Sequence, residues 1–381
     1  MHGFISELGN VQDPRTGNAK KHKLSDILFI AIAAVVADAD TWNRIEDYAI
    51  AHEEFFRKYL ELPAGIPSRD TFNRVFAIMD PAVLEANYQK RVKRFVQVSG
   101  DSVVSIDSKT IRGAGDKDGG SYAHIVSACL SDEGVSLGQL SVDSKTNEIT
   151  VMPQLLDMLD IGGCVVTADA MGCQKSIVRK VVEEKNASYV LAVKDNHRNL
   201  HEQVPETARM VRPTATFKEI DAGHGRVEER TYKIYRDLSL VTGTWNWPGL
   251  SALVVVESQR YDKKRKTESG QQRCYITSLP RDKGALIAHA IRNHRMMVES
   301  MHRVLDVVSG EDAGRKRACN AAENYSRLMK VVLNLLRSHK KKTRDSKSLA
   351  RMRKQAAWNT EVLEEILFHV FNDEKSEESG Q

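Results

Sequence analysis

Two short runs of apolar, β-forming residues in this chain each end in an aspartate. Val-Val-Ser-Ile precedes Asp107, and Cys-Val-Val-Thr-Ala precedes Asp169. If the two strands lie side by side, both carboxylates meet at one edge of a sheet, where hard oxygen ligands suit Mg²⁺. Because aspartate also follows strands simply as a turn former, these two residues alone leave a purely structural role open.

The residues around these aspartates predict a mixed α/β sheet. Apolar runs bounded by turn residues indicate strands, and apolar residues three or four apart indicate helices. By these rules we expect strands at 103–107, 122–130, 135–142, 163–169 and 188–194, and helices at 149–159 and 174–185. Three successive strands followed by alternating helices and strands are typical of such a sheet.

Helical patterns fill the chain before residue 101. Apolar residues recur at helical spacing over 24–37, 41–59 and 81–98, and Ser25 and Ser68 are suitable N-caps. We therefore expect a compact N-terminal helical domain at 1–100. Its most apolar stretch, 27–37, is too short to cross a membrane, which takes about 20 residues. We accordingly expect no membrane segment.

Strand signals return later in the chain, at 227–235, 252–259 and 273–278. They are followed by a strongly helical stretch from 283 to 337. We expect a catalytic domain at 101–337, interrupted after its fifth strand by a β insertion at about 200–280 that stands outside the central sheet. A basic segment and a C-terminal helix at 338–381 would close the chain.

A third carboxylate would have to come from the helix around 287–308, where Glu299 is the best candidate. It shares a helix face with three other polar residues, Arg295, His302 and Asp306. A salt-bridged structural face explains this spacing equally well, and two rival carboxylates follow, Glu311 and Asp312. Three carboxylates could hold two metal ions, one activating a water or a 3′-hydroxyl and the other stabilising the leaving oxygen.

Charge and cysteine usage limit the setting in which the chain works. The 381 residues carry a net charge of +5, which is compatible with nucleic acid without demanding it. Basic residues concentrate in 339–354, with a smaller cluster at 20–23; each could also be an ordinary solvated face or tail. The five cysteines are scattered, which indicates neither a disulfide framework nor a zinc site and fits a reducing cytoplasm.

Several motifs, in order along residues 20–337, resemble those of one known family. They are Ala64-Gly-Ile-Pro-Ser-Arg-Asp-Thr-Phe, Asp107-Ser-Lys-Thr-Ile-Arg-Gly, Ser144-Lys-Thr-Asn-Glu-Ile, Thr167-Ala-Asp-Ala-Met-Gly-Cys-Gln, Tyr189-Val-Leu-Ala-Val-Lys-Asp-Asn and His224-Gly-Arg-Val-Glu-Glu-Arg. The chain resembles the H-repeat-associated, ISAs-type insertion-sequence transposases of the DDE superfamily. An ordered series of motifs is much more specific than any single triplet of acids.

The resemblance implies both a fold and a chemistry. It implies an RNase H-like α/β core in which Asp107, Asp169 and Glu299 are the catalytic residues and the ligands of two Mg²⁺ or Mn²⁺ ions. It also implies metal-dependent cleavage of the element's ends and strand transfer to target DNA by in-line phosphoryl transfer. Around Glu299 the chain departs from the family, with Arg295, Ser300 and Arg303 where Trp, Asn and Trp are usual. A catalytically decayed or co-opted transposase that only binds DNA is therefore the alternative.

The partner implied by this resemblance is double-stranded DNA, both the terminal inverted repeats and the target. Cations must neutralise the DNA backbone, and the residues we expect at it are Lys109, Lys194, Arg226, Arg295, His302, Lys340, Lys341 and Lys342. Ordinary surface charge explains each of them as well. A homodimer in the DNA complex and a cytoplasmic, nucleoid-associated location complete these expectations.

Overall fold

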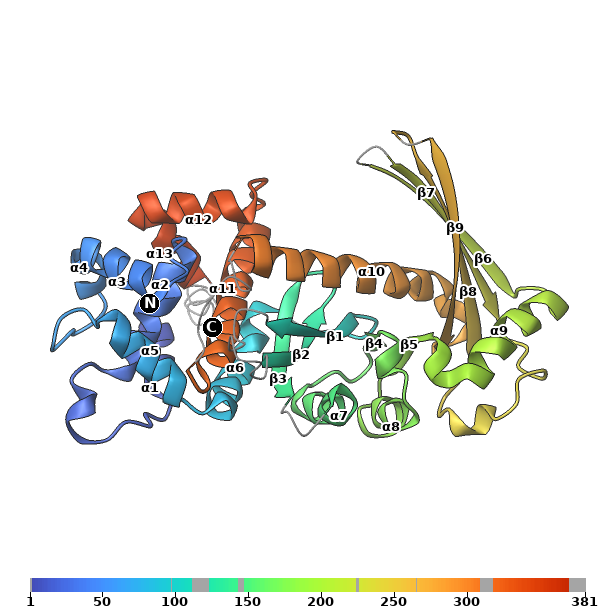
Figure 1. Cartoon of the computed structure of the whole chain (residues 1–381), viewed down its shortest axis with the longest axis horizontal. Coiled ribbons are helices and arrows are strands. Elements are labelled where there is room, and N and C mark those ends of the chain that lie inside the picture. Colours follow the sequence, from blue (N-terminus) through green and yellow to red (C-terminus); the bar gives the residue numbers. More distant parts are fainter. Residues whose placement is uncertain are drawn as a thin grey trace, which may run out of the picture.

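The computed structural model describes residues 2–96, 98–111, 123–142, 147–223, 226–264, 266–308 and 318–369. Helices from both ends of the chain form one body of the molecule (Figure 1). They are α1 (His2–Gly9), α2 (Leu24–Val36), α3 (Trp42–Ala51), α4 (Glu53–Arg57), α5 (Arg69–Ile78), α6 (Pro81–Phe95), α11 (Ala321–Thr343), α12 (Leu349–Trp358) and α13 (Thr360–Phe368). Among the described residues, no helix combines the length and the apolar character needed to span a bilayer.

The two ends of the chain share a single hydrophobic core. Helix α2 is buried along nearly its whole length, and Phe29 stacks on Phe368 of α13 with 6.0 Å between ring centroids. Trp42 meets Tyr325 of α11 edge to face at 5.4 Å. The basic stretch that the sequence assigns to a separate C-terminal segment is therefore helical and packed; its Arg353 is fully buried and paired with Asp38 and Asp40.

Local capping rules predict one helix start correctly and another wrongly. The Ser68 hydroxyl accepts a hydrogen bond from the Thr71 amide at 3.4 Å, so Ser68 is the N-cap of α5 as expected. Ser25 is not a cap, because α2 already begins at Leu24. A side-chain cap would contribute little to the stability of α2, because burial of its apolar residues against neighbouring helices supplies most of that stability.

The mixed α/β sheet expected from the sequence is confirmed. Its first five strands are β1 (Val103–Ile111), β2 (Ala123–Leu130), β3 (Val135–Val142), β4 (Val165–Ala168) and β5 (Ser188–Val193). Strand β2 runs antiparallel to β1, whereas β4 and β5 run parallel to it. One face packs against α7 (Glu148–Met158), α8 (Lys175–Arg179) and α9 (Arg198–Met210), and the other against α10 (Gly284–Arg303).

Residues 200–280 do not stand outside the central sheet, so this part of the expected layout is wrong. Strand β9 (Thr267–Thr277) pairs antiparallel with β5, and β8 (Ala252–Asp262), β7 (Arg226–Tyr235) and β6 (Ala215–Gly223) continue one nine-stranded sheet. The inner parts of β8 and β9 are apolar on both faces, and packing them beside β5 buries them. Neither α9 nor β6 was expected, since β6 is largely exposed and α9 contains an internal proline.

The outer parts of these four strands extend past the helices that cover the rest of the sheet (Figure 1). We call residues 217–223, 226–233, 256–262 and 267–273 the β arm. Nearly all positions there are exposed or half-buried, in contrast to the buried inner strands. Because α10 lies along the same face of the sheet from β1 to β6, the β arm and the first aspartate strand are connected by one helix.

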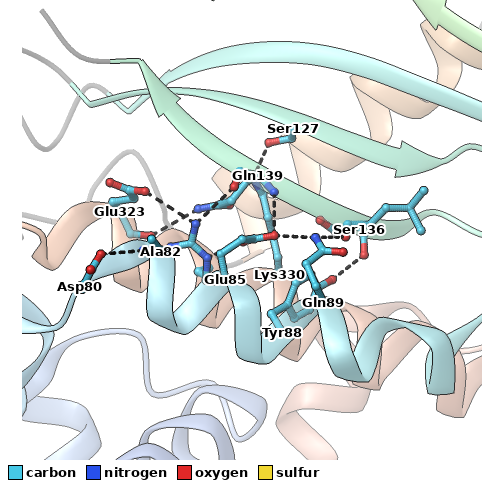
Figure 2. A network of polar contacts seen from close by, with 12 residues as sticks. Asp80, Ala82, Glu85, Tyr88, Gln89, Ser127, Ser136, Gln139, Glu323 and Lys330 are labelled. Carbon is cyan, nitrogen blue, oxygen red and sulfur yellow. Dashed lines mark hydrogen bonds and ion pairs between the residues drawn. The ribbon is translucent and has the colours of Figure 1, made fainter. Parts of the chain in front are cut away.

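A buried polar network joins the helical body to the sheet (Figure 2). Glu85 of α6 and Arg327 of α11 are both essentially inaccessible to solvent, and they form an ion pair at 2.6 Å. The second Glu85 oxygen accepts hydrogen bonds from the side chain of Gln89 at 2.7 Å and the backbone amide of Gln139 at 3.2 Å. Arg327 also donates from Nη2 to the Gln139 carbonyl at 3.3 Å, whereas its buried Nη1 has no hydrogen-bond partner among the described residues.

Candidate active site

Asp107 and Asp169 lie next to each other at one end of two parallel strands. Ile106 of β1 pairs with Ala168 of β4, so the aspartates occupy the next position in register. Strand β4 ends there, as expected, but β1 continues to Ile111, so the expectation that Asp107 ends its strand is wrong. Continued pairing with β2 prolongs β1; Asp107 itself pairs with Ser127.

Both carboxylates line one cavity of about 650 Å³. Its wall also includes Lys194 and Asp195 after β5, Arg273 of β9 and His294 of α10. The cavity thus collects side chains from four strands or strand ends and from two helices, since His201 of α9 lines it as well. This is where carboxylates from different parts of the sequence converge, as a metal or phosphate site requires.

The pKa of Asp107 is raised to about 6, chiefly because the group is buried; a backbone hydrogen bond at Ser108 opposes this shift, and the nearby carboxylates of Asp169 and Glu148 add to it. The cost of ionising this group comes mainly from its removal from water, and the like charges nearby add to it. A cation beside Asp107 would reduce that cost, because an opposite charge favours the ionised carboxylate.

The raised pKa predicts that Asp107→Asn stabilises the protein in EDTA at pH 7.5. The folded pKa of about 6 exceeds the unfolded value of 3.8, so Asp107 costs stability as the pH rises through this window. We expect the Asn variant to unfold at higher urea, by roughly 1–2 kcal/mol at pH 7.5, with no gain at pH 3.5. Equal stability of the two proteins at pH 7.5 would contradict the expected cost of ionising Asp107 in the folded protein.

Asp169 is held by the loop that follows it. Its Oδ1 accepts hydrogen bonds from the amides of Met171 at 3.0 Å and Gly172 at 3.4 Å. Glycine is required at 172, because a Cβ there would lie 2.5 Å from that of Ala168. The Ala-Asp-Ala-Met-Gly sequence therefore fixes the orientation of the carboxylate through a tight turn.

His294 also belongs to this site, although it is not among the site residues predicted from the sequence. Its Nδ1 lies 3.1 Å from the hydroxyl of Thr167, which is 3.0 Å from that of Ser105, which is in turn 2.6 Å from that of Ser131. Burial lowers the pKa of His294 to about 4, so the ring is neutral at physiological pH. Its position little more than one turn before Glu299 on the same helix is the signal that could have found it.

Glu299 lies on α10, but its side chain is outside the described part of the structure, and so are the rivals Glu311 and Asp312. The contacts on either side of Glu299 are described. Upstream, His294 contacts Thr167; downstream, Asp306 forms an ion pair with Lys109 of β1. The stretch of helix that carries Glu299 therefore runs between contacts to β4 and β1, the two aspartate strands.

The expected phosphate contacts lie in different places. Lys194 is exposed and lines the cavity of the aspartates. Lys109 is paired with Asp306, and Arg226 lies on the β arm, 3.5 Å from Asp262. The three lysines of α11 lie elsewhere: Lys340 donates to the Lys347 carbonyl, Lys341 to Glu133 and Lys342 to the His369 carbonyl. The side chains of Arg295 and His302 are outside the described residues.

Within the described ranges, no cluster of three or more His, Cys, Asp or Glu side chains is arranged to hold a metal ion. The two adjacent aspartates are hard oxygen donors on a shared cavity, which suits Mg²⁺ or Mn²⁺, and Mg²⁺ needs only one or two protein carboxylates beside water and phosphate. The two carboxylates thus fit such an ion.

Two protein-family profiles match this chain. Residues 98–335 match the transposase DDE domain, and residues 5–90 match the domain described as associated with it. The first covers the sheet, the β arm, α10 and most of α11; the second covers the N-terminal helices.

Relatives match nearly the whole chain. YncI of Escherichia coli O157:H7, which carries a transposase name, is 40% identical over 379 residues, covering 96% of this chain and 95% of YncI. YhhI of Escherichia coli K12, named as an H repeat-associated transposase, is 35% identical over 88% of this chain and 91% of its own. A piggyBac transposase solved in a synaptic complex with hairpin DNA has a TM-score of 0.46 at 12% identity, covering 97% of this chain and 79% of that one, too low a similarity to carry an argument.

Proposed function

This chain belongs to the DDE transposase family, and on that basis we propose that it cleaves the ends of an insertion sequence and joins them to target DNA by metal-dependent, in-line phosphoryl transfer. The observation that carries the proposal is the register of β1 and β4, which brings Asp107 and Asp169 together in one cavity within the matched domain. The strand order β3-β2-β1-β4-β5 supports an RNase H-like core.

Asp107, Asp169 and Glu299 are the residues that would hold two Mg²⁺ or Mn²⁺ ions. Metal ions at such a site supply activation of a water or 3′-hydroxyl and stabilisation of the leaving oxygen. Burial and the neighbouring carboxylates raise the pKa of Asp107, and a bound cation would offset both effects, which supports binding of cations there. Glu299 is proposed from its place on α10 between the contacts to β4 and β1.

The remaining side chains of the cavity position the DNA. Lys194 is exposed at its rim and would neutralise a phosphate beside the scissile one. His294 is neutral and held by Thr167, so it keeps α10 seated against β4 without competing for the proton of the nucleophile. Double-stranded DNA, both terminal repeats and target, is the proposed partner, with a homodimer in the DNA complex and a nucleoid location.

Incubating the full chain with DNA from the flanks of its gene tests this proposal. We expect cleavage and strand joining with Mg²⁺ or Mn²⁺, and neither in EDTA. Labelled DNA ends distinguish joining from simple cutting, so a nuclease that never joins would be recognised by cut ends alone. Full activity in EDTA would exclude metal-dependent transfer.

A DNA-binding protein without catalysis is the second candidate, favoured by Arg295, Ser300 and Arg303 at the usual Trp, Asn and Trp positions. The triple variant R295W/S300N/R303W restores those residues. If the natural chain binds DNA but cuts nothing while the triple variant cuts, the binding-only function holds for this copy. If both cut at similar rates, the departures do not matter to catalysis.

The lysines at the end of α11 provide a prediction about affinity. Replacing Lys340, Lys341, Lys342 and Arg344 with Gln should weaken binding to any duplex and flatten its salt dependence, by about 0.9 in log K against log salt for each phosphate that is no longer neutralised. Preference between DNA sequences should not change, because phosphate contacts carry no sequence information. If fluorescence anisotropy shows an unchanged salt dependence of DNA binding, these lysines make only intramolecular contacts.

A further inference from the structure

A second cavity, of about 320 Å³, adjoins the first along the β arm. Five arginines line it, four from the arm and one from α10: Arg226, Arg230, Arg260, Arg273 and Arg292. Two carboxylates, Asp221 and Glu228, are among its lining residues, and Glu219 and Asp262 beside it pair with Arg292 and Arg226, so five arginines face four carboxylates. We call this cavity the arginine groove.

The arginine groove is continuous with the cavity of the aspartates. Arg273, Tyr275 and Ile291 line both cavities, so no separate wall divides them. The register of the arm explains the shared face: Val256 pairs with both Tyr232 and Arg273, and these positions lie next to the apolar contact between the sheet and α10. Directly paired residues of a sheet point to the same side.

Three of the groove's arginines pair with carboxylates of the protein, and Arg230 is held by both oxygens of Glu228. Arg292 pairs with Glu219 at 3.2 Å and Arg230 with Glu228 at 2.8 Å, while Arg226 is 3.5 Å from Asp262. The more exposed pairs, those of Arg226 and Arg292, contribute little to stability and can exchange for another anion. The Nε of Arg260 is buried and has no hydrogen-bond partner in the described part of the chain. A buried donor left unsatisfied is costly, so an anion that reaches it would gain affinity.

Among the described residues of the arm, the opposite face carries two lysines, three glutamates and no arginine. There Lys218 pairs with Glu229 at 3.1 Å and Lys233 with Glu257 at 2.7 Å. The clustering of arginines is therefore specific to the face that leads into the active-site cavity. Arginine rather than lysine is the side chain whose planar fork matches phosphate oxygens.

We propose that the arginine groove binds the sugar–phosphate backbone of one DNA strand and guides it along the β arm away from Asp107 and Asp169. The inference rests on the proposed function, since it takes the adjoining cavity as the place of phosphoryl transfer. Several arginines in one line beside an acidic centre suit a polyanion that enters the centre at one phosphate and continues past it. A single small anion would use only one or two of them.

Salt-dependent binding tests the groove without relying on catalysis. The full chain is titrated in EDTA against a 40-base-pair duplex and against one strand of it. R260Q/R273Q should bind roughly tenfold more weakly and reduce the duplex salt slope by about 1.8, or the single-strand slope by about 1.4, because two phosphates are no longer neutralised. K218Q/K233Q removes the same charge from the opposite face and should keep the slope. R260K/R273K restores the positive charge and should recover most of the salt slope.

Cross-linking provides a readout that does not depend on the arginine variants folding well. Ser258 lines the groove, whereas Gln259 is exposed on the opposite face of the same strand. In a C319S background, which removes the exposed cysteine of the described residues, S258C and Q259C are reacted with a duplex carrying a thiol-reactive tether on one phosphate. S258C should cross-link at least several-fold faster. Equal cross-linking rates of S258C and Q259C would contradict the proposal that DNA lies in the arginine groove.

The outcomes separate this inference from the proposed function. If R260Q/R273Q and K218Q/K233Q have the same salt slope while the natural chain still cleaves DNA with Mg²⁺, the groove is wrong and the catalytic proposal stands. If R260Q/R273Q alone has a reduced salt slope of DNA binding but the natural chain cleaves no DNA with Mg²⁺, the proposed groove is supported and the proposed catalysis is contradicted. If the natural chain binds neither the duplex nor the single strand, both the groove and the proposed function are contradicted.

Discussion

Asp107→Ala is expected to lower metal-dependent DNA cleavage by at least roughly a thousandfold, because a site that loses a metal ligand forfeits several kcal/mol of transition-state stabilisation. The variant removes one of the two adjacent carboxylates in the cavity while leaving the β1–β2 and β1–β4 backbone pairing intact. The measurement is the single-turnover rate of cleavage of end-containing DNA at saturating Mg²⁺.

Asp195→Ala is the matched control. Asp195 lines the same cavity, but its side chain is 96% exposed, and it lies beyond the end of β5 rather than beside Asp169. We expect it to stay within a few-fold of the natural rate. DNA binding in EDTA should be retained by both variants. If Asp195→Ala loses as much activity as Asp107→Ala, general loss of negative charge, and not metal ligation at Asp107, explains the effect.

Arg327→Ala should have the largest effect on stability, lowering the free energy of unfolding by about 3–5 kcal/mol. It leaves Glu85 buried without its cation, at the junction of α6, α11 and β3. Removing one partner of a buried pair is costly because the other charge remains desolvated, whatever the pair contributed as a whole. Urea denaturation followed by circular dichroism measures the change.

Two comparisons test this explanation. Arg57→Ala breaks the exposed pair with Glu53, whose side chains are 50% and 39% accessible, and should cost less than about 1 kcal/mol. E85L/R327M replaces both charges with apolar groups and should regain most of the stability. If E85L/R327M is as unstable as Arg327→Ala, packing of the long side chains rather than the stranded charge is responsible.

The local alternation of residues was enough to predict most strands and helices of the sheet, and the run of motifs was enough to predict the family. The apolar residues before Asp107 and Asp169 alternate between the two buried faces, so their strands could be recognised without any partner. Ser68 could be recognised as a cap because its hydrogen bond to Thr71 involves neighbours only three residues apart.

Other features depend on contacts between residues far apart in the chain, which no local pattern contains. Strand β1 passes Asp107 because β2 pairs with it, and residues 252–277 join the central sheet because β5 offers an unpaired edge. His294 enters the site because α10 packs over β4, and the basic stretch near the C-terminus becomes helix because the N-terminal helices provide its core. The sequence by itself determined most of the elements, the family and the pair of aspartates. The tertiary structure alone decided which surfaces those elements share, because burial and strand pairing depend on partners distant in sequence.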